Sequence, residues 1–168
     1  MIKKMRLPRG AKPLAFLAGG ELAFSLGERV CVADTEGRWS VKASLEEPSM
    51  KSRLCRNRLV ARALRWEARC AVEVEGGLLV SWRGALLRCD LSTGGVRNVF
   101  SAREGFSTPL TIQHTNGEIG AVWGDYGQNA DKKPVGIYGI TREGTLRTLF
   151  EFPAGTVRHV HGFTPRLA

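Results

Sequence analysis

The segment TVRHVHGF, residues 156–163, places His159 and His161 two positions apart. Side chains at that spacing on a β-strand point to the same face, so a strand here would bring the two imidazoles together. Two neutral imidazoles can ligate a divalent metal if Asp125 or Glu151 approaches, and the same pair can move a proton. One hypothesis for this segment is therefore a metal site on His159 and His161. The alternative is a structural pair that hydrogen-bonds backbone carbonyls of a neighbouring sheet.

A polar loop, GDYGQNADKKP at 124–134, supplies the other candidates and is longer than the turns around it. Its carboxylate, phenol, amide and ammonium groups belong to Asp125, Tyr126, Asn129, Lys132 and Lys133. Sugars and acidic glycans need donors and acceptors of these kinds, and long loops commonly carry ligand sites. The predicted ligand-binding residues are Asp125, Tyr126, Asn129, Arg158, His159 and His161. The alternative is a solvated hairpin in which Asn and Gly serve the turn geometry.

The composition predicts one folded domain over residues 1–168, because 43% hydrophobic residues can build a core. Its apolar runs are far shorter than the roughly 20 residues that span a bilayer, so no transmembrane helix is expected. The basic N-terminus precedes a small apolar patch, but Pro13, the pair Gly19 and Gly20, and Glu21 interrupt it. This pattern does not match a signal peptide, and we expect a cytoplasmic protein.

The net charge of +9 makes nucleic acid a candidate partner. Positive charge is densest over residues 51–69, where seven basic residues stand against one glutamate. Only Trp66 lies within this stretch to stack on a base. The pattern therefore favours a solvated basic face over nucleic-acid binding.

Motifs of several enzyme classes do not occur. The sequence contains no GxxxxGK[ST], no HExxH and no GxSxG, so nucleotide hydrolysis, zinc proteolysis and serine hydrolysis have no support. The cysteines show no CxxC pair and no spacing typical of zinc, and we expect buried, reduced thiols at Cys31, Cys55, Cys70 and Cys89.

A repeated pattern predicts the elements that would position these residues. Residues 19–45, 76–100 and 116–150 each have a Gly-led turn, a strand, a second turn, a strand, a polar Gly turn and a third strand. The segments 58–74 and 107–115 can each supply a remaining strand of a four-stranded antiparallel sheet. A basic amphipathic helix over 51–65 is an alternative for part of this region, but the alternation that continues into CAVEV favours a strand from about Arg58.

Repeated four-stranded sheets are typical of β-propeller blades. The predicted fold class is all-β, a partial β-propeller of about three four-stranded antiparallel blades, at approximately 14–58, 59–108 and 109–163. An immunoglobulin-like sandwich is the main competitor, but it does not explain the recurring glycine-strand-turn-strand phrase. Three blades do not close a ring, so we expect an incomplete propeller that self-associates through open sheet edges.

Two segments, GGLLVSWRGALLRCDLSTG at 76–94 and VWGDYGQ through VRHVHGF at 122–163, resemble the sialidase-like, BNR-repeat group of glycoside-hydrolase-type β-propellers. In such proteins a G-[DE]-Y…N…PV-x-I-Y segment, a degenerate Asp-box turn and an FPAG-x-[IV]-RH-[IV]-HG segment occur in this order. ITREGTLR keeps only Gly144 of the Asp-box, and the sialidase arginine triad, paired carboxylates and tyrosine nucleophile have no counterparts. No catalytic residue is therefore predicted.

The resemblance implies a glycan-related propeller that acts as a binding module or as a degenerate glycoside hydrolase. The alternative is a propeller that serves as a protein-interaction scaffold without catalysis, and a basic nucleic-acid-binding protein is less favoured. The only cofactor that the sequence suggests is the divalent metal at the histidine pair.

Overall fold

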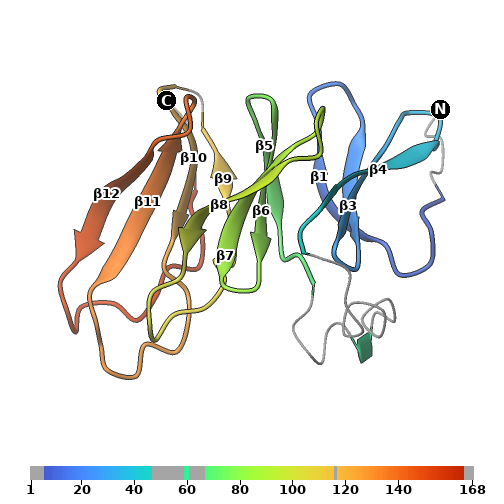
Figure 1. The fold of residues 1–168 in the computed structure, drawn as a ribbon. Coiled ribbons are helices and arrows are strands. Elements are labelled where there is room, and N and C mark those ends of the chain that lie inside the picture. The colour runs from blue at the N-terminus through green and yellow to red at the C-terminus, as the bar shows by residue number, and fades with distance from the viewer. Residues whose placement is uncertain (1–5, 47–58, 61–66, 116, 165–168) are drawn as a thin grey trace.

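The computed structural model describes residues 6–46, 59–60, 67–115 and 117–164, and every structural statement below refers to these. They form an all-β protein of three four-stranded antiparallel sheets (Figure 1). Each sheet is a meander of consecutive strands, as the repeated pattern predicts. The sheets agree with propeller-like blades and are called blades 1, 2 and 3 below.

The strand bounds follow the turns read from the sequence. Blade 1 contains β1 (Lys12–Phe16), β2 (Leu22–Leu26), β3 (Arg29–Ala33) and β4 (Trp39–Ser44). Blade 2 contains β5 (Ala71–Val74), β6 (Gly77–Trp82), β7 (Ala85–Asp90) and β8 (Val96–Ser101). Blade 3 contains β9 (Gln113–His114), β10 (Ile119–Gly124), β11 (Val135–Thr141) and β12 (Leu146–Phe152).

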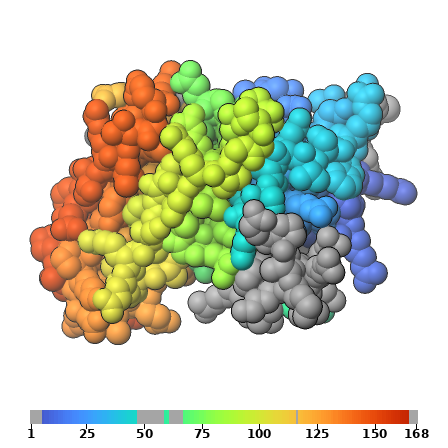
Figure 2. Space-filling view, viewed as in Figure 1, coloured from blue at the N-terminus to red at the C-terminus, as the bar shows by residue number. Residues whose placement is uncertain are grey.

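The blades are arranged as an arc. Their first strands, β1, β5 and β9, contact one another in series, while β4, β8 and β12 form the far edges of the three sheets. Figure 2 shows blade 2, in green and yellow, between blade 1 in blue and blade 3 in orange and red. Successive sheets therefore pack face to face, with their short first strands on one side of the molecule.

Apolar side chains between neighbouring blades form the two larger parts of the core. Val30 and Val32 of blade 1 share one cluster with Leu78 and Val80 of blade 2. Between blades 2 and 3, a second cluster includes Leu79, Leu86, Phe100, Trp123, Tyr138 and Ile140. Neighbouring residues on β6 point into different clusters, which explains why the run GLLVSW is buried along its whole length.

The last strand of every blade carries a β-bulge. The register skips Lys42 between the partners of Val30 and Cys31, and Val99 between those of Leu86 and Leu87. In blade 3 it skips Leu149. A bulge bends its strand and increases the local twist. The same irregularity at the same place in three sheets shows that the blades are repeats of one geometry.

Two predicted strands differ from the structure. Residues 157–163 contain no strand in the described chain, because this segment has no ladder partner and is held by single contacts such as Val160 N to Asp125 O, 2.8 Å. The strand predicted from about Arg58 begins only at Ala71, and Leu59 and Val60 are helical. Most of the basic stretch 51–69, including Trp66, lies outside the described residues.

The prediction of buried, reduced thiols is confirmed for Cys31 and Cys89, whereas Cys70 is only half-buried. All three are free thiols, and Cys55 lies outside the described residues. In the described part of the chain, no helix is long and apolar enough to cross a membrane.

Candidate functional site

Three connections meet at one end of blades 2 and 3. They are the β8–β9 connection (102–112), the β10–β11 loop (125–134) and the segment 153–164 that follows β12. Ser107 forms an antiparallel bridge with Tyr126. The backbone N–H of Asn129 donates a hydrogen bond to the backbone oxygen of Gly105 at 3.2 Å. These contacts fix the β10–β11 loop against the β8–β9 connection.

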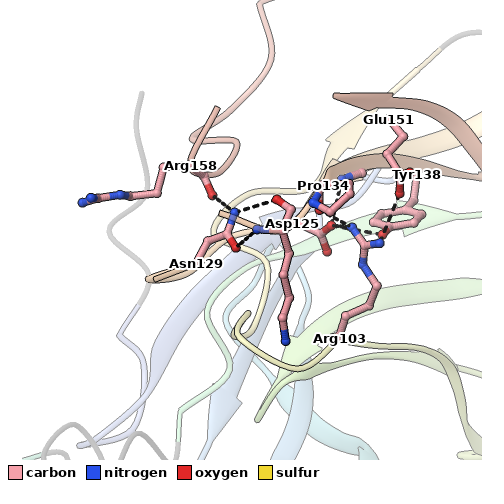
Figure 3. A network of polar contacts seen from close by, with 9 residues as sticks. Arg103, Asp125, Asn129, Pro134, Tyr138, Glu151 and Arg158 are labelled. Atoms are coloured by element: carbon pink, nitrogen blue, oxygen red, sulfur yellow. Dashed lines mark hydrogen bonds and ion pairs between the residues drawn. The ribbon is translucent and has the colours of Figure 1, made fainter. Parts of the chain in front are cut away.

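Asp125, the first residue of this loop, lies in a buried polar network (Figure 3). Its Oδ2 accepts hydrogen bonds from Gly136 N at 2.8 Å and from the Tyr138 hydroxyl at 3.1 Å. The same oxygen pairs with the Arg103 guanidinium, whose other terminal nitrogen reaches Glu151 at 3.1 Å. Burial and the Asp125 charge raise the pKa of Tyr138, so this phenol stays protonated and donates to the carboxylate.

This network joins the β8–β9 connection, the β10–β11 loop, β11 and β12. It leaves few free hydrogen-bonding groups for a ligand. Asp125 has 1% of its side chain exposed, and three donors occupy one of its oxygens. Its other oxygen, Oδ1, is buried and has no hydrogen-bond partner in the described structure. The geometry therefore gives Asp125 a structural role at the start of the loop.

Asn129 is the second buried polar residue of the loop and fixes its shape. It has a φ of 42°, in the left-handed region that Asn tolerates better than most residues. Its Oδ1 accepts from Lys133 N at 2.8 Å, and its Nδ2 donates to Lys133 O at 2.9 Å and to Arg158 O at 3.1 Å. Asn129 thus serves the turn geometry and also ties the loop to the segment that carries the histidines.

Tyr126 and the histidine pair form an aromatic cluster on the outer side of the loop. The Tyr126 ring lies edge-on to His159 and His161, with centroid distances of 4.9 and 5.7 Å. The two imidazoles meet through their Nε2 atoms, 2.8 Å apart. The two imidazoles therefore lie together, although the strand that was expected to place them side by side does not form.

The hydrogen bonds of the pair define its tautomers when both rings are neutral. His159 Nδ1 lies 2.7 Å from the carbonyl oxygen of Gly127, which can only accept, so this nitrogen carries a proton. Nε2 of His159 is then an acceptor, and Nε2 of His161 donates to it. Nδ1 of His161 is left as an acceptor. Hydrogen bonds are therefore donated in one direction, from His161 to His159 and from His159 to the carbonyl oxygen of Gly127.

A cavity of about 480 Å³ opens beside this cluster and is called the loop pocket below. Its lining residues are Arg69, Gly105, Phe106, Ser107, Tyr126, Gly127, Gln128, Arg158 and His159. Arg69 donates to Thr108 O at 3.2 Å and places its guanidinium carbon 5.7 Å from the Tyr126 ring centroid. The exposed Arg158 side chain points away from the Asn129 network in Figure 3. Two cations and two aromatic rings therefore line one cavity.

The structure divides the predicted site residues into two groups. Tyr126, Arg158 and His159 line the loop pocket, and His161 contacts two of them. Asp125 and Asn129 are buried and do not line the pocket. Sequence reasoning missed Arg69 and Phe106, which come from connections far away in the chain. Arg69 belongs to the basic stretch 51–69, and nothing in that stretch indicated that this one arginine would lie beside Tyr126.

The metal hypothesis finds no third ligand in the part of the chain that the structure describes. No group of three or more His, Cys, Asp or Glu side chains gathers there in a geometry that could hold a metal ion. The carboxylates suggested as partners, Asp125 and Glu151, are both paired with Arg103. Two imidazoles with their Nε2 atoms already in hydrogen-bond contact would have to separate to ligate a metal.

Comparison with known protein families and with characterised proteins finds no family and no protein that matches this chain.

Proposed function

We propose that this protein is a glycan-binding propeller module and that the loop pocket binds an acidic sugar. The observation that carries the proposal is the pairing of Arg69 and Arg158 with Tyr126 around one cavity. Among the described residues that line it, none is acidic. A guanidinium binds a carboxylate through two parallel hydrogen bonds, and an aromatic face packs against the apolar C–H face of a sugar ring.

The partial likeness to sialidase-like, BNR-repeat propellers supports the same proposal. The likeness is clearest from Gly124 to Gly162, the region that contributes Tyr126, Arg158 and His159 to the loop pocket. Under this proposal the protein recognises a glycan and acts as a binding module rather than as a hydrolase. His159 forms part of the pocket wall, and His161 holds its ring in place through the contact between their Nε2 atoms.

The test compares acidic and neutral sugars. A glycan array should show binding to sialic or uronic acid sugars and weaker binding to their neutral counterparts. Arg158→Gln should weaken this binding by about tenfold, because a hydrogen-bonded ion pair contributes about 1.5–3 kcal/mol. Lys132→Gln is the matched control, since it removes the same charge from an exposed position nearby that does not line the pocket.

Two results would reject the proposal. One is an array without acidic-sugar binding by a protein that circular dichroism shows to be folded. The other is an equal loss of binding in Arg158→Gln and Lys132→Gln, which would mean that only net charge matters. Binding to any DNA or RNA with a steep salt dependence would support the nucleic-acid alternative instead.

A protein-interaction propeller is the second candidate, and the surface of β12 favours it. Leu146, Leu149 and Phe150 expose 43%, 42% and 53% of their surface on this one strand. Exposed apolar groups gathered in this way are typical of protein-binding surfaces. This candidate predicts a partner whose binding is lost in Phe150→Lys and unchanged in Arg158→Gln.

A further inference from the structure

Two arginines of blade 2 converge at the end of the sheets opposite the loop pocket. Arg88 on β7 and Arg97 on β8 are direct partners in the antiparallel register. A Cβ built on Gly144, in the β11–β12 turn of blade 3, would lie 2.8 Å from Arg88 Nη1 and 2.7 Å from Arg97 Nη2. Both guanidinium groups therefore reach one point between blades 2 and 3.

The positive charges of these two guanidinium groups are not neutralised by ion pairs with neighbouring side chains. Among the ion pairs of the described residues, none includes Arg88 or Arg97. Arg88 donates through Nη2 to the backbone oxygen of Glu75 at 2.7 Å, which leaves its Nη1 directed at the shared point. Like charges placed directly opposite on neighbouring strands destabilise a sheet. An anion between them would remove that cost.

Asp90 lines the same cavity, but its carboxylate is held in the turn that follows β7 rather than paired with either arginine. Oδ1 of Asp90 accepts from Ser92 N at 2.8 Å, from the Ser92 hydroxyl at 2.6 Å and from Thr93 N at 2.9 Å. These hydrogen bonds, Ser92 first, lower the pKa of Asp90 to about 2 and hold it in the turn. Hydrogen bonds from its own backbone N–H and from Thr141 lower the pKa of Glu143.

A cavity of about 420 Å³ lies at the arginine pair and is called the arginine groove below. Among the residues that line it are Arg88, Arg97, Asp90, Thr93, Gly95 and Gly76. The Thr93 hydroxyl oxygen accepts from Gly95 N at 3.2 Å, and the same hydroxyl donates to the Asp90 carboxylate, which holds the turn beside the two arginines in place. The groove thus combines two guanidinium groups with one carboxylate, which leaves a net positive charge.

We propose that the arginine groove binds a tetrahedral oxyanion, the phosphate or sulfate group of an ester. Both groups present three oxygens to donors from different directions, and a phosphate monoester also carries about −1.5 to −2 charge at neutral pH. Two planar guanidinium groups that approach from adjacent strands match that geometry. Gly144 leaves the space for this convergence, and its φ of 91° is one that side chains rarely adopt.

The experiment titrates the whole chain with inorganic phosphate at constant ionic strength and follows backbone amides by NMR. Saturable shifts are expected at Thr93, Gly95 and Gly144. Arg97→Gln and Arg88→Gln should each weaken this binding by about tenfold or more. Arg9→Gln removes one positive charge from an exposed position outside the groove and should leave the affinity unchanged. Thermal unfolding checks that every variant is folded.

The readout separates this site from the loop pocket, whose amides at Gly127 and Gln128 report any second binding event. A sugar phosphate and the matching sugar sulfate, titrated in parallel arms, distinguish the two sources of the oxyanion. The proposal is overturned if Thr93, Gly95 and Gly144 show no saturable shift. It is equally overturned if Arg9→Gln weakens binding as much as Arg97→Gln, because the effect would then come from net charge alone.

Discussion

Asp125 shows how one residue can have the chemistry of a ligand group and the position of a structural one. Its carboxylate binds Arg103, Tyr138 and Gly136 and is almost completely buried. The same loop exposes Tyr126 to the cavity one residue later. A polar residue beside a pocket is therefore no guide to ligand contact unless its burial is known.

Replacement of Asp125 should lower stability more than it changes ligand affinity. In Asp125→Ala the Tyr138 hydroxyl and Gly136 N–H lose their acceptor while they remain buried, which costs about 1–3 kcal/mol for each group. We expect a total loss of about 2–4 kcal/mol in the free energy of unfolding, measured by urea denaturation. Tyr138→Phe, which removes one donor and leaves the carboxylate, should cost about 1 kcal/mol. Equal losses in both variants would contradict this interpretation.

The buried thiols predict a loss of stability in alkali. Burial raises the pKa of Cys31 to about 11, with Arg29 acting in the opposite direction, and raises the pKa of Cys89 to about 12, both from 9.0. Between pH 9.0 and these values the unfolded chain releases thiol protons that the folded chain retains, so unfolding becomes more favourable as pH rises. Below this window the contribution to stability is fully present.

Urea denaturation at a series of pH values measures this effect. The wild type should lose stability steadily above about pH 9. A variant with Cys31→Ala and Cys89→Ala should show a shallower dependence on pH, although its free energy of unfolding near neutral pH is lower because two buried side chains are truncated. A variant with the same alkaline slope as the wild type would show that lysines and tyrosines account for the loss.

At the scale of elements, the β10–β11 loop depends on Asn129. This side chain bonds both the N–H and the C=O of Lys133 and reaches the backbone oxygen of Arg158. The loop is thereby fixed to the segment that carries the histidines. The loop pocket exists only while these two pieces of backbone stay together.

Asn129→Ala should open the loop to protease. The variant loses all three hydrogen bonds and places an alanine at a φ of 42°, so we expect faster trypsin cleavage after Lys132 by about tenfold. Asn129→Gly accepts the φ but still loses the bonds, and it should be cleaved at an intermediate rate. Mass spectrometry of the fragments identifies the cleavage site. Unchanged cleavage in both variants would show that Asn129 does not hold the loop.

Sequence reasoning predicted the strands well where local pattern decides them. The run GLLVSW and the alternation in ALLRCD gave β6 and β7, and the glycine turns gave their ends. The segment 157–163 has an equally strand-like pattern, but a strand requires a partner to complete its hydrogen bonds, and pattern alone does not supply one. The bulges have the same cause, since they depend on the register between two strands.

The candidate site was predicted in part for a related reason. Tyr126, Arg158 and His159 lie close in sequence to the long loop and the HxH segment that drew attention to them. Arg69 and Phe106 reach the pocket from other connections, and Arg103 reaches Asp125 across 22 positions of the chain. Such approaches follow from blade packing, which single residues do not reveal.

At the scale of the whole molecule, self-association through open sheet edges stays a prediction, and β12 is the strand that it would use. Its side chains are exposed along almost the whole strand, and its charged residues are already paired, Arg147 with Glu118 and Glu151 with Arg103. The bulge at Leu149 disturbs the edge for strand pairing, so we expect contact through apolar side chains rather than through an extended ladder.

Light scattering over a range of protein concentrations tests this expectation. The wild type should form dimers or larger species at high concentration, and Phe150→Lys should shift the distribution toward monomers. Val41→Lys is a matched control on β4, the corresponding strand of blade 1, where a similarly exposed apolar residue is replaced. A wild type that stays monomeric at high concentration would contradict the prediction.

The consecutive strand order within each blade has a consequence for how the chain reaches its structure. Every ladder joins neighbours in sequence, so a blade needs no strand made later in synthesis to complete its hydrogen bonds. Formation of such local contacts loses little loop entropy and is fast. The strands of blade 1 can therefore pair completely while the ribosome is still translating blade 3. Only the apolar clusters between blades must wait for the next sheet to emerge.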